Sequence, residues 1–165
     1  MIFFVFLPFI YTLNQNLTIM MFQSFHDKFP TVAEAETKSV VFLQENEYGV
    51  PVDSYLFVEL FCNDKKCDCR RVFLEVYSDP QKYPVAVICW GWEPVAFYRK
   101  WLGFTDKEIL IELKGPALNS GSYQSPIAPA LLKYASEILL KDKDYTDRIQ
   151  RHYTMFKKKT PLKFH

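Results

Sequence analysis

Two strand-like runs joined by a short polar segment constrain the fold of this chain most. Residues 55–61 and 71–77 are rich in β-branched and aromatic residues, which favour strands. The segment between them is polar and carries three cysteines, so we expect it to form the tip of a β-hairpin rather than part of a core.

The apolar side chains of the two runs also predict how the strands pair. One face of the first run carries Leu56, Val58, Leu60 and Cys62. One face of the second run carries Val72, Leu74 and Val76. Pairing Leu60 with Val72 brings these two faces together. The same register keeps Glu59 from facing Glu75, which would be a like-charge pair.

Further signals complete an α+β pattern. Residues 39–43 and 85–90 are typical of strands, and helical spacing of apolar residues predicts helices over 95–102, 105–115, 127–139 and 145–158. Gly103 and Gly115 are the expected stops of the first two helices. Because the strands come first and the helices follow, we predict an antiparallel sheet of three to four strands, followed by and packed against three to four helices.

The length of 165 residues suits one domain, which we place at residues 21–160, with a tail at 161–165. With 15 Phe, 10 Tyr and 3 Trp, the chain can build a core without disulfide bonds. The formal net charge of +1 gives no strong overall attraction to nucleic acid or to anionic membranes.

Residues 1–20 form an apolar N-terminal extension that three interpretations can explain. A signal peptide would show a basic start and a small-residue cleavage site, and neither is visible. A transmembrane helix needs about twenty apolar residues, whereas Asn14, Gln15 and Asn16 interrupt this segment. The third interpretation is a start placed too far upstream, with Met20 or Met21 as the true first residue. We expect no stable membrane insertion and a cytoplasmic location.

The chemically distinctive residues are Cys62, Cys67 and Cys69, which lie within eight residues of one another. Closely spaced thiolates on a tight loop are typical of structural zinc sites, so we predict bound zinc. Regular hairpin pairing would send Cys62 and Cys69 to opposite sides of the sheet. The three sulfurs can therefore meet only if the chain leaves regular pairing between the two strands.

A structural zinc site usually takes four protein ligands, and His152 is the predicted fourth. It lies on the apolar stripe of the last helix and must face some partner. The alternative is a histidine that packs in the core without a metal. His26 is a weaker candidate. Cys89 is predicted to be a core thiol, because hairpin pairing places it near Phe73, about 13 Å along a strand from Cys69.

Several motifs resemble those of a known family. They are Cys-Asn-Asp-Lys-Lys-Cys-Asp-Cys-Arg-Arg-Val at 62–72, Gly-Trp-Glu at 91–93, Phe-Tyr-Arg-Lys-Trp at 97–101, Ala-Pro-Ala-Leu-Leu at 128–132 and Arg-His-Tyr-Thr-Met-Phe at 151–156. Over about residues 55–156 the chain resembles a family of short bacterial proteins with no assigned activity. The resemblance implies a shared fold and a shared cysteine cluster, and it implies nothing about activity.

The leading functional hypothesis is a zinc-binding interaction or accessory protein, in which the metal pins the hairpin tip and a macromolecular partner binds. The alternative is a thiol redox or metal-dependent enzyme that uses Cys67 and Cys69 directly. Unligated thiols are the third interpretation of the cysteines. The basic end around Lys157, Lys158 and Lys159 is explained by a solvated helix end, where cations are favoured, so nucleic-acid binding is not our prediction.

Overall fold

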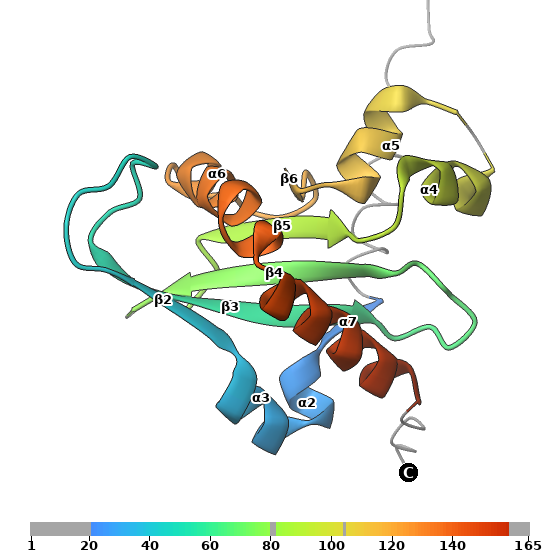
Figure 1. Cartoon of the computed structure of the whole chain (residues 1–165), viewed down its shortest axis with the longest axis horizontal. Coiled ribbons are helices and arrows are strands. Elements are labelled where there is room, and N and C mark those ends of the chain that lie inside the picture. Colours follow the sequence, from blue (N-terminus) through green and yellow to red (C-terminus); the bar gives the residue numbers. More distant parts are fainter. Residues whose placement is uncertain (1–20, 80–81, 104, 159–165) are drawn as a thin grey trace, which may run out of the picture.

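The computed structural model describes residues 21–79, 82–103 and 105–158, which form an antiparallel sheet with helices packed against it (Figure 1). Within these ranges the sheet has six strands, in the order β1-β3-β4-β5-β6, with β2 also paired to β3. The strands are β1 (Phe22–Ser24), β2 (Lys38–Phe42), β3 (Asp53–Cys62), β4 (Arg71–Ser78), β5 (Ala86–Gly91) and β6 (Ala117–Leu118). The predicted extension at 1–20 and tail at 161–165 lie outside the described residues.

The predicted α+β class is confirmed, and the predicted element counts are too low. The helices of the described ranges are α2 (Phe25–Lys28), α3 (Pro30–Glu36), α4 (Val95–Leu102), α5 (Lys107–Lys114), α6 (Ala128–Glu137), the 3-10 helix η1 (Leu139–Lys141) and α7 (Lys143–Lys158). Strands β1 and β6 contain three and two residues, too few to leave an alternating pattern in the sequence. Helices α2 and α3 also precede β2, so strands and helices are less strictly separated than predicted.

Local signals set the ends of the helices in the second half of the chain. Gly103 adopts a left-handed conformation with φ of 76° and ends α4 as predicted, because glycine has no Cβ to oppose that conformation. Helix α5 begins at Lys107, two residues after the predicted start at residue 105, and Asp106 precedes its first turn. The Asp106 side chain accepts hydrogen bonds from the backbone N–H groups of Glu108 and Ile109, which stabilises the first turn.

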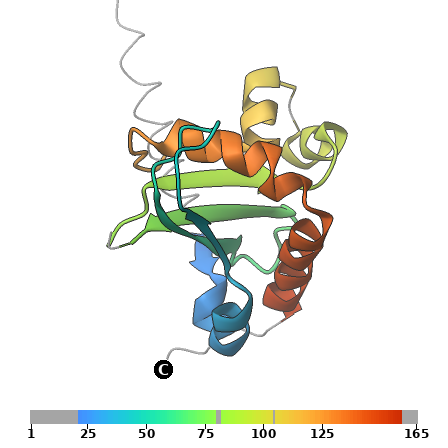
Figure 2. The same cartoon turned by 60° about the vertical axis from the view of Figure 1, so that its left-hand side comes forward.

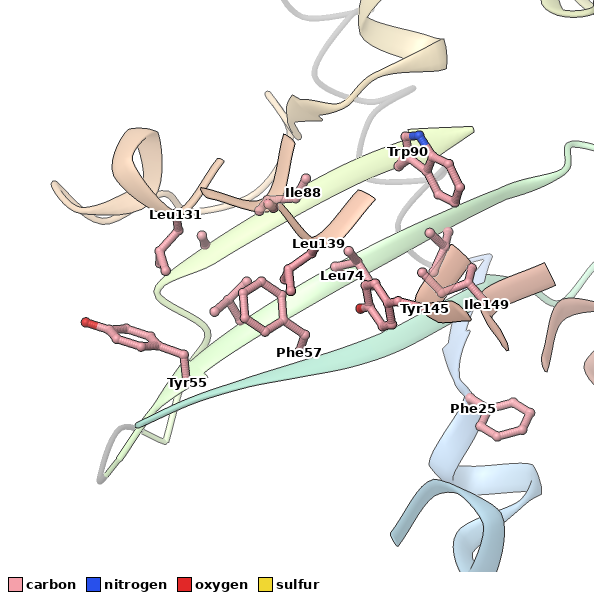
Figure 3. Close-up of a cluster of buried hydrophobic side chains, with 14 of the residues drawn as sticks. Phe25, Tyr55, Phe57, Leu74, Ile88, Trp90, Leu131, Leu139, Tyr145 and Ile149 are labelled. Carbon is pink, nitrogen blue, oxygen red and sulfur yellow. The ribbon is translucent and has the colours of Figure 1, made fainter. Parts of the chain in front are cut away.

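The main core lies between one face of the sheet and helices α6 and α7 (Figure 2). Side chains that are at most 2% exposed meet there from strands and helices (Figure 3): Tyr55, Phe57, Leu74, Ile88, Leu131, Leu139, Tyr145 and Ile149. Burying each large apolar side chain contributes about 1.5–3 kcal/mol to stability, so this face is the main source of folding energy.

The pairing of β3 with β4 differs by one residue from the prediction. Leu60 lies opposite Phe73, not opposite Val72. A shift of one residue exchanges the two faces of a strand. The helix-covered face therefore carries the aromatic residues Tyr55, Phe57 and Phe61, while Leu60 joins Phe73, Val87 and Cys89 in a smaller apolar cluster. Large rings bury more apolar area under the helices than the aliphatic residues would, which favours the observed register.

Candidate metal centre

The chain leaves regular hairpin pairing at the tip of β3 and β4, as the metal hypothesis requires. The pairs between β3 and β4 end at Leu60 and Phe73. Cys62 pairs instead with Phe22 of β1, and the backbone N–H of Asn63 donates to the carbonyl of Met21 at 2.7 Å. The tip is therefore free to follow its own path between Asn63 and Arg70.

A tight turn and a backbone reversal shape this path. The Asp64 side chain accepts a hydrogen bond from the N–H of Lys66 at 2.9 Å, and the Asp64 carbonyl accepts one from the N–H of Cys67 at 3.2 Å. Arg70 then adopts a φ of 48°, in the left-handed region that few residues other than glycine occupy. The two features together let Cys67 and Cys69 turn back toward Cys62.

The structure brings the three predicted cysteines together, and we call Cys62, Cys67 and Cys69 the cysteine cluster. Their sulfur atoms all lie within 4.8 Å of one another, in an arrangement that could hold a metal ion. All three thiols are free of disulfide bonds. Cys62 and Cys69 are buried, whereas Cys67 is partly exposed.

The thiols act strongly on one another. The Cys69 thiol donates to the sulfur of Cys62, and with the Asp64 backbone and the Lys157 ammonium it lowers the pKa of Cys62 to about 6, against the opposing effect of burial. A hydrogen bond from Cys69 also lowers the pKa of Cys67. The same two sulfurs raise the pKa of Cys69, because they hold its proton. A metal cation among the three sulfurs would replace that shared proton.

Side-chain hydrogen bonds from helix α7 hold the hairpin tip in place. The Tyr153 hydroxyl accepts a hydrogen bond from the N–H of Arg70 at 3.4 Å and donates one to the Asp68 carboxylate at 3.3 Å. One turn later, the Lys157 ammonium donates to the carbonyl of Asp64 at 2.8 Å. The helix therefore contacts the tip at two places: Lys157 at Asp64, before Cys67, and Tyr153 at Asp68 and Arg70, around Cys69.

His152, the predicted fourth ligand, is not brought to the cysteines. Its ring is 1% exposed and stacks on Phe25, with 4.2 Å between the ring centroids. Nδ1 lies 2.7 Å from Glu59 and Nε2 lies 2.9 Å from Glu36, so both nitrogens have carboxylate partners. We call Glu36, Glu59 and His152 the carboxylate–histidine cluster. The structure thus gives His152 the role of a packed core histidine with satisfied nitrogens.

The two glutamates of this cluster are polar residues that sequence reasoning missed. Glu59 lies on the helix-covered face of β3 and is 5% exposed. A glutamate within an apolar strand signals that a buried partner exists, because an unpartnered carboxyl group is costly there. The sequence does not say which partner, since His152 lies 93 residues away. Arg151 pairs with Glu36 and, together with His152, lowers the pKa of Glu36.

The other candidate ligands also lie apart from the cysteine cluster. Cys89 lies opposite Phe73, as predicted, and is a buried thiol whose sulfur lies 3.2 Å from the carbonyl of Ala117. Burial raises the pKa of Cys89, as expected for an apolar site. His26 is exposed, and its Nε2 lies 4.0 Å from Glu34.

Searches with this chain find no matching family model, no matching curated protein and no matching solved structure. The resemblance to a bacterial family therefore stays a prediction. Within the described residues, every helix is too short or too polar to cross a membrane.

Proposed function

We propose that this protein binds one zinc ion through Cys62, Cys67 and Cys69 and that the metal pins the hairpin tip, which then presents a rigid surface to a macromolecular partner. The observation that carries the proposal is the meeting of three sulfur atoms within 4.8 Å. Tetrahedral zinc with Zn–S bonds of about 2.3 Å separates its sulfurs by about 3.8 Å, so a small contraction would bring all three sulfurs to bonding distance of one zinc ion.

The donor set and its surroundings support zinc over harder cations. Thiolates are soft ligands that favour zinc, copper(I) and iron–sulfur centres over magnesium or calcium. The Lys157 ammonium lies close enough to lower the pKa of Cys62 and Cys67, which favours the thiolate forms. Free thiols persist in a reducing compartment, so the cytoplasm is the proposed location.

Metal analysis of the full chain tests the proposal. We expect close to one zinc per chain, slow titration of the three cluster thiols, and a lower free energy of unfolding after chelation. If free zinc stands about a thousandfold above its dissociation constant, chelation lowers that free energy by about 4 kcal/mol.

Two cysteine variants supply the matched comparison. Cys67→Ser should lose the zinc and the effect of the chelator on stability. Cys89→Ala also removes a thiol, but one outside the cysteine cluster, and it should keep one zinc per chain. Equal zinc content in the two variants, or chain purified and refolded with zinc that holds none, would rule the metal site out.

The second candidate function is thiol redox chemistry. It is favoured by the partial exposure of Cys67, because an oxidant can reach that sulfur while the other two sulfurs lie within 4.8 Å of it. Metal-free protein with a readily reducible disulfide between two cluster cysteines would support this function over the zinc site.

A further inference from the structure

A pocket of about 310 Å³ opens beside the cysteine cluster, between the hairpin tip and the C-terminal half of α7. Cys67 lines this pocket and is also the partly exposed member of the cluster. The side chain of Cys67 therefore connects the pocket to the three sulfurs.

Lysines dominate the lining of this pocket. Lys65 and Lys66 come from the hairpin tip, and Lys157 and Lys158 come from the last turn of α7. Lys65, Lys66 and Lys158 are exposed and form no salt bridge with another described residue. The pocket thus concentrates positive charge in one small space.

The carboxylate that lines the pocket does not cancel this charge. Asp68 is paired with Arg70, whose guanidinium approaches it at 2.9 Å, and it accepts the hydroxyl of Tyr153. Arg70 is itself shared with Glu93 at 2.9 Å. Asp68, Arg70 and Glu93 together carry a charge of about −1, so the four lysines still set the sign of the potential.

The negative charge of a metal bound by three thiolates would account for one of the four lysines. A divalent ion with three thiolates carries a net charge of −1, which a neighbouring cation stabilises. Lys157 fills that role, since it is close enough to act on both Cys62 and Cys67. Three exposed lysines around the same pocket go beyond this need.

The number of protein ligands at the proposed metal site is a second argument for a ligand in this pocket. Among the histidine, cysteine and acidic side chains of the described residues, the three cysteines alone make up the candidate metal group. Zinc takes four ligands, and sites with three protein ligands keep a fourth position for water or substrate. Cys67 lines the pocket, so a fourth ligand that enters from the pocket would come from the side where the lysines lie.

We propose that this pocket binds a small anion bearing phosphate or carboxylate oxygens, which takes the fourth position on the metal and is held by Lys65, Lys66 and Lys158. The inference rests on the proposed metal site and names the ligand class of that site. The volume of about 310 Å³ lies at the lower end of ligand pockets, which favours a small molecule over a long polymer.

Cobalt-substituted full chain allows the metal and the anion to be measured separately. Inorganic phosphate and acetate are titrated at constant chloride and under reductant, and the visible bands of cobalt report a change of its ligands. The variant Lys65→Ala with Lys66→Ala removes two charges from the pocket. The control Lys107→Ala with Lys141→Ala removes two exposed lysines from other helices.

A saturable shift of the cobalt bands with phosphate or acetate, weakened about tenfold in the Lys65/Lys66 variant and unchanged in the control, supports the inference. Cobalt bound at one per chain with bands that neither anion moves overturns the inference and leaves the metal site standing. Equal weakening in the two variants also overturns it, because net charge alone would then explain binding. Absence of bound cobalt overturns both proposals. Binding of heparin without any response to the small anions replaces this ligand class with a polyanion.

Discussion

The cysteine cluster and the carboxylate–histidine cluster both lie against α7, and they differ in which groups serve as their hydrogen-bond partners. In the carboxylate–histidine cluster, each ring nitrogen of His152 faces a carboxylate, and Arg151 pairs with one of these carboxylates. In the cysteine cluster, three sulfurs share protons among themselves. The chain itself supplies a partner for each nitrogen of His152, although Oε1 of Glu59 has no hydrogen-bond partner among the described residues. The three sulfurs, by contrast, have lone pairs left that a cation could accept. The cysteine cluster is therefore the one of the two whose arrangement could hold a metal ion.

Neighbouring residues of one helix serve these two clusters. His152 points to the core, where Glu59 lies, while Tyr153 and Lys157 point to the hairpin tip. Adjacent residues on a helix lie about 100° apart, whereas residues four apart share a face. The helix therefore separates a structural histidine from the contacts that support the cysteines.

Replacing His152 by leucine should give the largest change in stability. It leaves the buried carboxyl group of Glu59 without its partner and removes the stack on Phe25. We expect a loss of about 3 kcal/mol in the free energy of unfolding, measured by urea denaturation. Zinc content should stay unchanged, because both ring nitrogens of His152 already have carboxylate partners.

The double variant Glu59→Leu with His152→Leu is the control for this result. It removes the two buried polar groups and should recover much of the lost stability, since Glu36 keeps its pairing with Arg151 and the buried part of the site is then apolar. Loss of zinc from folded His152→Leu protein would contradict the comparison and return His152 to the set of metal ligands.

Replacing Tyr153 by phenylalanine should have a smaller effect, confined to the hairpin tip. The hydroxyl bonds to Arg70 and Asp68, so its removal should cost about 1 kcal/mol and weaken zinc binding. Tyr145→Phe is a matched control, because the buried Tyr145 hydroxyl has no hydrogen-bond partner among the described residues. Its removal should leave zinc affinity unchanged and should not lower stability, since a buried hydroxyl without a partner costs free energy. Equal losses in the two variants would mean that the contacts of Tyr153 do not support the metal site.

Sequence patterns predicted the long elements and the cysteine cluster, and they failed where long-range packing decides. Strands β3, β4 and β5 and the helices α4 to α7 lie close to the residues predicted for them. The spacing of the three cysteines along one hairpin is local information, and it predicted that they could meet if the chain left regular pairing. The pairing of Cys62 with Phe22 of β1 is part of that departure, and no local pattern shows it. The register of Leu60 and the partners of His152 depend on which face the helices cover, and no local pattern encodes that choice.

The smallest expected effect is the acid sensitivity of the carboxylate–histidine cluster. The hydrogen bond from Arg151, followed by that from His152, lowers the pKa of Glu36 in the folded chain. A depressed carboxyl pKa stabilises the fold above the unfolded pKa of about 4.3, and this contribution is lost as pH falls through the folded pKa. Glu36 is 30% exposed, so solvent screening keeps the effect modest.

Urea denaturation of chelated protein between neutral and acidic pH isolates this contribution, because no metal is then released on acidification. Glu36→Gln should flatten the fall in stability between about pH 5 and pH 3, the window around and below the unfolded pKa. Glu45→Gln removes an exposed carboxylate from the loop after β2 and should keep the slope of the parent chain. If both variants keep that slope, Glu36 adds nothing to the acid sensitivity of the fold. Of the two carboxylates next to His152, Glu59 alone would then contribute to stability.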